Sequence, residues 1–358
     1  MGLNTADRLK RLRQKLAEKE LDGIFISQPE NRYYLSGFDG SAGYLLITAQ
    51  DAILATDFRY IEQAKSEAPE YKIFQITGNI SEWFPRLLAE FNLKRLGFES
   101  EHLTYDQHQR FSDILNNAQP QLNLIPVVGL VESLRMVKEP AEVELIGQAV
   151  EISDKAAEYI VNKISPGMTE KEVAWDIEKF MRKNGSQSMP FDIIVASGPN
   201  SALPHAKPSE RQIGPGEPVI MDIGARAGGY SSDLSRTICL GSSDSTFQKV
   251  YDTVLQAQQA AISGIKDKMT GDEADSIARK VIETAGYGQA FGHALGHGIG
   301  LAVHEEPRLG PNSTQVLSPG MVFSIEPGIY LPGWGGVRIE DLATIENGKI
   351  RVLSKARK

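Results

Sequence analysis

Two aspartates lie within one strongly apolar stretch of this chain. The stretch covers residues 219–237 and reads VIMDIGARAGGYSSDLSRT, with Asp222 and Asp233 on either side of a Gly228-Gly229 turn. Apolar runs flank the turn, which predicts a β-hairpin whose paired strands bring the two carboxylates close together. Two carboxylates in an apolar strand pair repel each other, and a shared divalent cation would remove the repulsion. The rest of the chain should therefore supply further ligands.

Length and charge limit the classes of protein to consider. The chain has 358 residues, which is enough for two domains because single hydrophobic cores stop growing at roughly 250–300 residues. Its net charge is −8 and its Lys and Arg residues form no block, so neither nucleic acid nor a membrane is an expected partner. No apolar signal segment or membrane span of ~20 residues is visible, and the single cysteine, Cys239, excludes an internal disulfide framework. These features predict a cytoplasmic protein.

Helical and strand patterns alternate from residue 5 to about residue 131, which predicts a compact α/β domain. The following stretch contains Pro140, where one helix should stop and another begin, because proline lacks an amide donor and restricts the residue before it. We therefore place a first domain over residues 1–130 and a second over residues 131–358.

The second domain contains an internal repeat. Residues 164–185 align without gaps with residues 265–286, and both segments carry Met-Thr-x-x-Glu, which is typical of a capping box at a helix start. Both segments end on a glycine, which suits a left-handed helix C-cap. Each precedes a strand-rich segment, so two equivalent halves around a shared sheet are predicted. A cleft between such halves is a natural place for a site.

Three further acidic or imidazole residues lie in segments with signs of a packed interior. His297 lies in a glycine-rich segment, Glu326 interrupts a strand pattern, and Glu340 lies in another strand pattern across a Gly/Pro turn. A second hairpin would thus present two carboxylates, as the first does. Two divalent cations would cancel the charge of the four carboxylates. Oxygen-rich ligation favours Mn²⁺, or Co²⁺ in vitro, with Zn²⁺ as an alternative.

For each of these residues alone, a structural role is the ordinary explanation. Asp222 could be a turn former, Glu326 a charge at a strand end, and Glu340 an exposed edge residue. His293 and His297 have the spacing of helical zinc motifs, but the glycines around them argue against a helix. The joint pattern favours a metal centre of the kind that performs metal-assisted hydrolysis.

The ligand pattern resembles that of the pita-bread metallopeptidases, the group that contains prolidase, aminopeptidase P and methionine aminopeptidase. The matching residues, in order and spacing, are Asp222, Asp233, His297, Glu326 and Glu340. The resemblance covers about residues 130–350. Residues 31–43 and 56–60 are similar to the creatinase/prolidase N-terminal domain, which methionine aminopeptidases lack.

The resemblance implies both a fold and an activity. The fold is α+β, with a creatinase/prolidase-like α/β domain followed by a pita-bread domain of pseudo-twofold halves around a curved antiparallel sheet. The activity is that of an Xaa-Pro dipeptidase or Xaa-Pro aminopeptidase acting on proline-containing di- or oligopeptides. The implied assembly is a homodimer, which the sequence itself does not show.

The resemblance also implies a role for each ligand. Asp222 would hold one metal ion, His297 and Glu326 the other, and Asp233 and Glu340 would bridge the two. A hydroxide bridging the metal ions would attack the bond before proline, whose nitrogen has no hydrogen for main-chain recognition. Glu326 is also one of two candidates for the group that protonates the departing proline nitrogen.

Three histidines and two arginines complete the implied site. His205 would contact the substrate and stabilise the oxyanion, and His304 would orient the substrate and is the other candidate proton donor. His293 matches a further active-site histidine of aminopeptidase P-like members. Arg338, beside Glu340, would support the ligands and the bound substrate. Arg308 resembles the arginine that pairs with the free carboxylate of a terminal proline in some prolidases.

Substrate length stays open from the sequence. Arg308 favours dipeptides, whereas His293 and residues 37–43 resemble Xaa-Pro aminopeptidases. Two other functions are also compatible with the scaffold: a creatinase-like hydrolase that uses no metal, and a non-catalytic pita-bread binding module. The presence of all five ligands favours the metallopeptidase over both.

Overall fold

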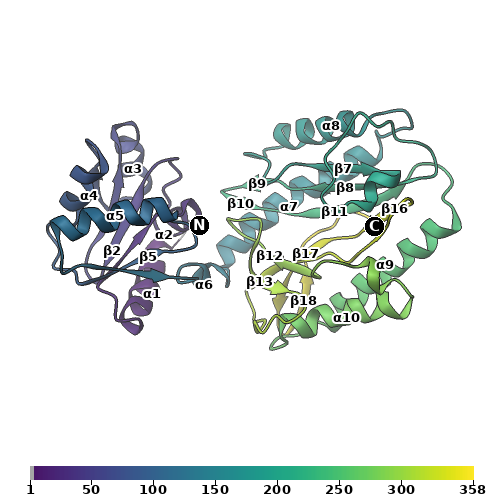
Figure 1. Ribbon diagram of the computed structural model, residues 1–358. Coiled ribbons are helices and arrows are strands. Elements are labelled where there is room, and N and C mark those ends of the chain that lie inside the picture. Colours follow the sequence, from purple (N-terminus) through teal and green to yellow (C-terminus); the bar gives the residue numbers. More distant parts are fainter. Residues whose placement is uncertain (1–3) are drawn as a thin grey trace. The chain divides into compact units, whose positions relative to one another are not determined.

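The computed structural model describes residues 4–358, and its internal contacts divide the chain into two compact units, Met1–Arg135 and Met136–Lys358. The first unit contains a six-stranded sheet in the order β4-β3-β2-β1-β5-β6, surrounded by helices (Figure 1). Its strands are β1 (Gly23–Ile26), β2 (Tyr44–Thr48), β3 (Ala52–Thr56), β4 (Lys72–Gln75), β5 (Arg95–Glu99) and β6 (Asn123–Val127). Its helices are α1 (Thr5–Glu18), α2 (Pro29–Ser36), the short 3₁₀ helix η1 (Phe58–Tyr60), α3 (Ile61–Glu67), α4 (Ile80–Leu88), α5 (Tyr105–Ala118) and α6 (Glu132–Arg135).

Phe25 in β1 lies at the centre of the first unit's core. Its ring stacks on Tyr44 of β2 with centroids 5.0 Å apart and meets Phe84 of α4 edge-on at 5.3 Å. Such offset and edge-to-face pairs add to the stabilisation that apolar burial gives. β1 pairs antiparallel with β2 and parallel with β5, so the unit is the mixed α/β domain that the sequence predicts.

The second unit contains a three-stranded sheet β11-β8-β7, a five-stranded sheet β13-β12-β14-β17-β18, and two small hairpins, β10-β9 and β15-β16 (Figure 1). The elements of its first half are α7 (Pro140–Val161), α8 (Glu170–Lys183), β7 (Ile194–Ser197), η2 (Gly198–Ala202), β8 (Pro218–Ile223), β9 (Arg226–Ala227), β10 (Tyr230–Ser231) and β11 (Leu234–Cys239). Those of its second half are α9 (Ser245–Gly264), α10 (Gly271–Thr284), η3 (Gly288–Ala290), β12 (Gly296–Gly298), β13 (Glu305–Leu309), β14 (Val322–Ile325), β15 (Gly328–Leu331), β16 (Gly335–Arg338), β17 (Asp341–Glu346) and β18 (Lys349–Val352).

The internal repeat appears as two helix pairs, α7 with α8 and α9 with α10. Helices α8 and α10 both begin with the capping box read from the sequence, and the glycines that follow them have φ of 100° and 89°. Such φ values disfavour any residue with a side chain, which explains the glycines. Each helix pair packs its apolar side chains into its own hydrophobic cluster with the neighbouring strands. The two halves predicted from the sequence are therefore present.

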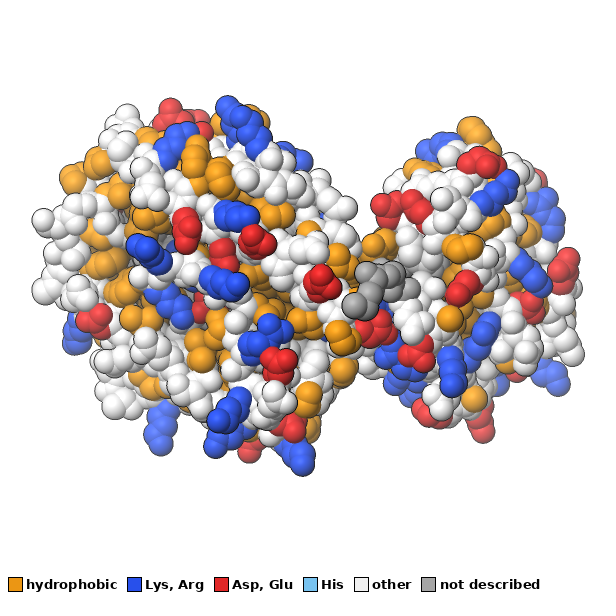
Figure 2. Space-filling model, turned by 180° about the vertical axis from the view of Figure 1, so that it is seen from behind, with side chains coloured by type: hydrophobic (Ala, Val, Ile, Leu, Met, Phe, Trp, Pro, Cys, Tyr) orange, Lys and Arg blue, Asp and Glu red, His pale blue; other side chains and the backbone are white. Residues whose placement is uncertain are grey.

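Among residues 4–358, no helix combines the length and the apolar character that crossing a bilayer requires. Figure 2 shows basic and acidic side chains interspersed on the displayed faces of both units.

Candidate metal centre

Each of two antiparallel strand pairs in the second unit brings two of the predicted carboxylates together. β8 and β11 pair antiparallel with Asp222 opposite Ser235, and Asp233 lies just before β11. In the second half β14 pairs with β17, Glu326 follows β14, and Glu340 precedes β17. The small hairpins β9-β10 and β15-β16 form the turns between the paired strands. The predicted hairpins thus exist, each with a second hairpin at its turn that the sequence pattern did not predict.

Asp233, His297 and Glu340 come together in the fold. One potential ligand atom from each lies within 4.8 Å of the others. His297 Nε2 is 3.7 Å from Asp233 Oδ2 and 3.3 Å from Glu326 Oε1. The strand ends of the two halves therefore meet at one cluster of side chains, called the acidic group below. Its members are Asp222, Asp233, His297, Glu326 and Glu340.

The carboxylates of this group lie close enough together to shift one another's pKa values. The pKa values of Asp233 and Glu340 are both raised well above their usual range, first by burial and then by neighbouring carboxylates. Burial would also raise the pKa of Glu326, but the hydrogen bond and the charge of His297 outweigh it and lower that pKa. Burial lowers the pKa of His297, and Glu326 more than offsets this effect, so the net direction is upward. Asp233 and Glu340 need protons or cations to be stable in this interior.

Three carboxylate oxygens of this group are buried and accept no hydrogen bond from any residue in the described range 4–358. They are Asp222 Oδ1, Asp233 Oδ1 and Glu340 Oε1. Nearly all buried polar atoms in proteins have a partner, so three such atoms in one place need an explanation. Converging carboxylate oxygens with one imidazole are ligands that divalent cations accept. The residues present therefore fit a metal centre.

Ser324 on β14 orients two of the predicted ligands. Its hydroxyl donates to Glu326 Oε1 over 2.8 Å and accepts the backbone N–H of His297 over 3.0 Å. His297 Nδ1 lies 3.1 Å from Gly298 O, so a proton placed on Nδ1 leaves the Nε2 lone pair facing the carboxylates. Ser324 was not predicted from the sequence, although its position two residues before Glu326 was an available signal.

Arg338 connects one carboxylate to the surrounding hydrogen bonds. Its Nη2 donates to Asp222 Oδ2 over 2.7 Å, its Nε to Ser235 Oγ over 2.7 Å, and its Nη1 to the Tyr330 hydroxyl over 2.8 Å. Burial lowers the pKa of Arg338, but the neighbouring Tyr330 and Asp222 raise it well above its usual value. Tyr330 also lies 3.0 Å from His293 Nε2. Tyr330 was not predicted from the sequence as part of the site.

We expect Arg338→Met to weaken divalent cation binding by about 10- to 100-fold, because outer hydrogen-bond partners orient metal ligands. Titration calorimetry with Mn²⁺ on wild type and variant measures this change. Arg338→Lys, which keeps the charge but not the planar fork, should recover only part of the affinity. Unchanged affinity in Arg338→Met would show that Asp222 is held without it.

Of the three predicted histidines, His304 contacts this group directly. The ring of His304 is T-shaped to the ring of His297, with centroids 4.2 Å apart, although His304 is exposed overall. Partial burial of its ring lowers the pKa of His304, with His297 and His205 adding to the effect. Burial also lowers the pKa of His293. His205 is exposed in a turn after η2. The lowered pKa values favour the neutral imidazole form of His293 and His304.

A buried ion pair fixes the segment that follows His304. Lys138 Nζ lies 2.7 Å from Glu305 Oε1, and the two side chains are 1% and 7% exposed. The backbone N–H of Lys138 donates to Gly320 O over 2.8 Å, and Val137 forms a β-bridge with Met321. The first residues of the second unit are therefore joined to the segment before β14.

Arg308 lies opposite His297 in the register of β12 and β13. Directly opposite residues of an antiparallel pair project from the same face of the sheet. Arg308 is exposed, and its Nη1 donates to Pro311 O over 3.0 Å. The structure thus places Arg308 near the acidic group with its guanidinium turned toward the following loop.

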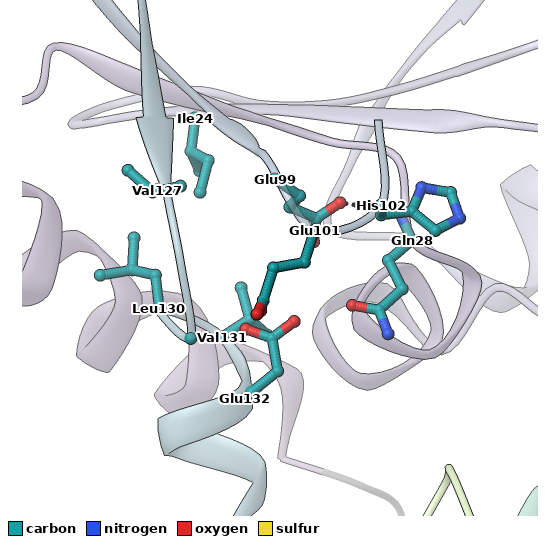
Figure 3. Close-up of a pocket in the computed structure, with 10 residues that line it drawn as sticks. Ile24, Gln28, Glu99, Glu101, His102, Val127, Leu130, Val131 and Glu132 are labelled. Carbon is teal, nitrogen blue, oxygen red and sulfur yellow. Dashed lines mark hydrogen bonds between the residues drawn. The ribbon is translucent and has the colours of Figure 1, made fainter. Parts of the chain in front are cut away.

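A separate cavity of about 140 Å³ lies in the first unit and includes none of the predicted site residues. Figure 3 shows Glu99, Glu101 and Glu132 around it. The buried Glu99 accepts the N–H groups of Ser27 and Gln28 over 2.6 and 2.7 Å. The Glu99 carboxylate therefore has a structural role, because it binds the backbone N–H groups before α2. The acidic group of the second unit is the better candidate for a functional site.

Comparison with known proteins adds family evidence to this geometry. Residues 144–347 match metallopeptidase family M24, and residues 8–137 match the creatinase/prolidase N-terminal domain. An Xaa-Pro dipeptidase of Pyrococcus furiosus is 38% identical over 357 residues, covering 98% of this chain and 99% of that protein. An Xaa-Pro dipeptidase structure from Bacillus anthracis has a TM-score of 0.95 at 43% identity and covers 99% of both chains. An X-Pro aminopeptidase structure from Thermotoga maritima has a TM-score of 0.89 at 36% identity and covers 98% of both chains.

Proposed function

Because this chain belongs to metallopeptidase family M24, we propose that it is an Xaa-Pro peptidase that hydrolyses the bond before proline with two divalent metal ions. The metal proposal rests on one observation: Asp233, His297 and Glu340 lie close together, and carboxylate oxygens at this place are buried without a hydrogen-bond donor among residues 4–358. The substrate class is supported by relatives that are named Xaa-Pro dipeptidase and that match this chain over almost their whole length. The creatinase/prolidase N-terminal domain is also present in this chain.

The metal ions would be held by Asp222, Asp233, His297, Glu326 and Glu340, with Asp233 and Glu340 shared between them. Ions of this kind supply a water of lowered pKa and a Lewis acid for the carbonyl of the cleaved bond. Mn²⁺ is the first choice because oxygen donors predominate, and Co²⁺ and Zn²⁺ are the alternatives. We also propose a homodimer, as the family resemblance implies.

The remaining residues would act on the peptide. His205 and His304 are exposed, and the ring of His304 contacts the ring of His297. Both histidines would hydrogen-bond the substrate carbonyl and stabilise negative charge on its oxygen. His304 and Glu326 are the two candidates to pass a proton to the proline nitrogen. His293 is held by Tyr330 and would line the substrate site.

The test is hydrolysis by protein reconstituted with Mn²⁺, with Co²⁺ and Zn²⁺ in parallel. An Xaa-Pro dipeptide, an Xaa-Pro-Xaa tripeptide and a matched peptide with alanine in place of proline are compared. Cleavage of the proline peptides alone supports the proposal. No cleavage with any of the three metals would contradict it, and full activity after complete metal removal would favour a metal-free hydrolase.

Arg308 makes a dipeptide the preferred substrate in this proposal, since the residue lies opposite His297 in the strand register and a guanidinium can pair with the carboxylate of a C-terminal proline. We expect Arg308→Ala to lower kcat/KM for the dipeptide by about 10- to 100-fold, the effect of a lost charged hydrogen bond, and to change tripeptide cleavage much less. Arg351→Ala on β18, another exposed arginine, is the control. Equal losses on both peptides would remove the carboxylate-binding role.

A further inference from the structure

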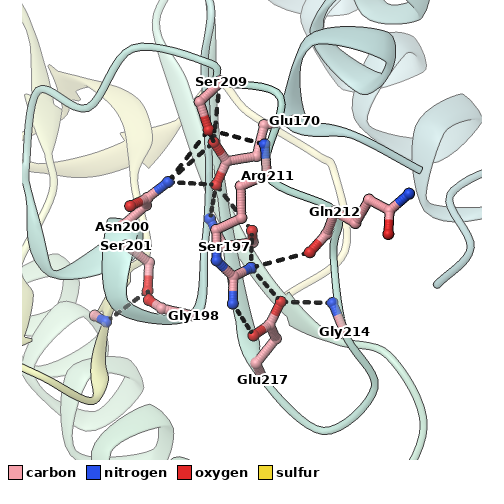
Figure 4. Close-up of polar contacts among 11 residues, drawn as sticks. Glu170, Ser197, Gly198, Asn200, Ser201, Ser209, Arg211, Gln212, Gly214 and Glu217 are labelled. Carbon is pink, nitrogen blue, oxygen red and sulfur yellow. Dashed lines mark hydrogen bonds and ion pairs between the residues drawn. The ribbon is translucent and has the colours of Figure 1, made fainter. Parts of the chain in front are cut away.

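We propose that Glu170 is a positioning residue that holds His205 in place by clamping both ends of the loop that carries it. The inference rests on the proposed function, because it assumes that His205 contacts the substrate. The loop runs from the end of β7 through η2 to residue 209 (Figure 4). Glu170 lies outside the acidic group and the ligand set.

The Glu170 carboxylate is fully buried and accepts hydrogen bonds from both ends of this loop. Its Oε1 accepts the N–H and the hydroxyl of Ser197, each over 2.8 Å. Its Oε2 accepts the N–H and the hydroxyl of Ser209 over 3.0 and 2.6 Å. Asn200 Nδ2 lies 3.1 Å from both oxygens. One side chain therefore closes the loop, as Figure 4 shows.

The helix that carries Glu170 does not need this carboxylate in order to begin. Helix α10 starts with the same capping box as α8, and in the aligned repeat Gly271 stands at the position of Glu170. A Cβ on Gly271 would lie only 2.1 Å from Arg308 O, so the second half has no room for a side chain there. Both halves therefore start the helix with the same capping box, and only the first half has a carboxylate that closes the loop.

The rest of the loop is attached to the elements that carry the acidic group. Ser201 Oγ accepts the N–H of Gly336 on β16 over 2.8 Å. Arg338 Nη1 donates to the carbonyl of Pro204, the residue before His205, over 3.3 Å. His205 itself is exposed, so packing of its ring cannot fix its position. The position of His205 then depends on how firmly its loop is held.

Replacement of Glu170 by glutamine keeps the size of the side chain but puts an NH₂ group against N–H and O–H donors, which frees one end of the loop. We expect kcat for an Xaa-Pro dipeptide to fall by about tenfold or more, since small displacements of catalytic groups are costly, while bound metal per chain stays at the wild-type value. Glu172→Gln in the capping box of the same helix turn is the matched control and should change kcat by less than about twofold. Ser209→Ala, which removes one donor hydroxyl, is the milder variant if Glu170→Gln does not fold.

A double-mutant cycle separates positioning from a general loss of stability. If Glu170 acts through His205, Glu170→Gln should cost little once His205 is already alanine. Additive losses would overturn the proposal.

A readout that does not need activity is the ring resonance of His205 in ¹H–¹³C NMR spectra. It should be single and sharp in wild type and in Glu172→Gln, and broadened or split in Glu170→Gln. An unchanged His205 resonance would also overturn the proposal. If wild type cleaves no Xaa-Pro peptide, the proposed function fails while this resonance still tests the clamp.

Discussion

Asp233→Asn should abolish metal loading and lower Xaa-Pro hydrolysis by more than about a thousandfold, a loss in keeping with removal of metal-ion catalysis. Asp222→Asn should leave about one metal ion per chain. Asp233 shares one small space with His297 and Glu340, so its loss removes an oxygen that both ions would use. Asp222 is held from one side by Arg338 and offers only its Oδ1.

Elemental analysis of bound Mn²⁺ per chain, combined with peptide cleavage by the same samples, measures this difference. Asp252→Asn, an exposed aspartate on α9, is the matched control and should keep both metal and activity. Equal metal loss from Asp222→Asn and Asp233→Asn would contradict the unequal roles of the two aspartates.

Removal of the metal ions should destabilise the protein more at pH 8 than at pH 5. Asp233 and Glu340 have folded-state pKa values raised above their ordinary values of 3.8 and 4.5. The folded protein then keeps protons that the unfolded chain releases, so the stability from these groups is lost as pH rises through their folded pKa values. Bound cations take the place of the protons at higher pH. We expect a difference of several kcal/mol between loaded and metal-free protein at pH 8, or about 10 °C in Tm.

Other groups that titrate in the same pH range also change the stability of the protein, and a variant separates their effect from that of the carboxylates. The lowered pKa values of His293 and His304 give stability that is present above their ordinary 6.5 and is lost as pH falls, which opposes the trend. Asp233→Asn removes one carboxylate and leaves these histidines in place. In metal-free urea denaturation, the variant should therefore gain stability relative to wild type as pH rises from 5 to 8. A difference between variant and wild type that does not change with pH would refute this account.

The sequence allowed the prediction of those parts of the site that local patterns encode. The apolar runs around Gly228-Gly229 indicated a strand pair with Asp222 and Asp233, and β8 and β11 form that pair. The Met-Thr-x-x-Glu repeats indicated two helix starts, and α8 and α10 begin there. The α+β architecture and the metallopeptidase family were both predicted and are confirmed.

What could not be predicted are contacts between side chains far apart in the chain. Tyr330 joins Arg338 to His293 through one hydroxyl, and no periodicity of the sequence marks that hydroxyl. In the sequence Glu170 has the pattern of an ordinary acidic residue in the first turn of a helix. Its hydrogen-bond donors lie on a loop after β7, which the local pattern does not indicate. Such contacts depend on tertiary packing, which a single sequence does not encode locally.

The way in which the second unit begins determines where the chain can be cut. Val137 and Lys138 precede α7, yet the first bridges Met321 and the second forms the buried ion pair with Glu305. A truncated protein that starts at the helix would leave the Glu305 carboxylate buried without its lysine, one residue from His304. The catalytic unit therefore includes its short leading segment, and any fusion or excision should join the chain before Met136.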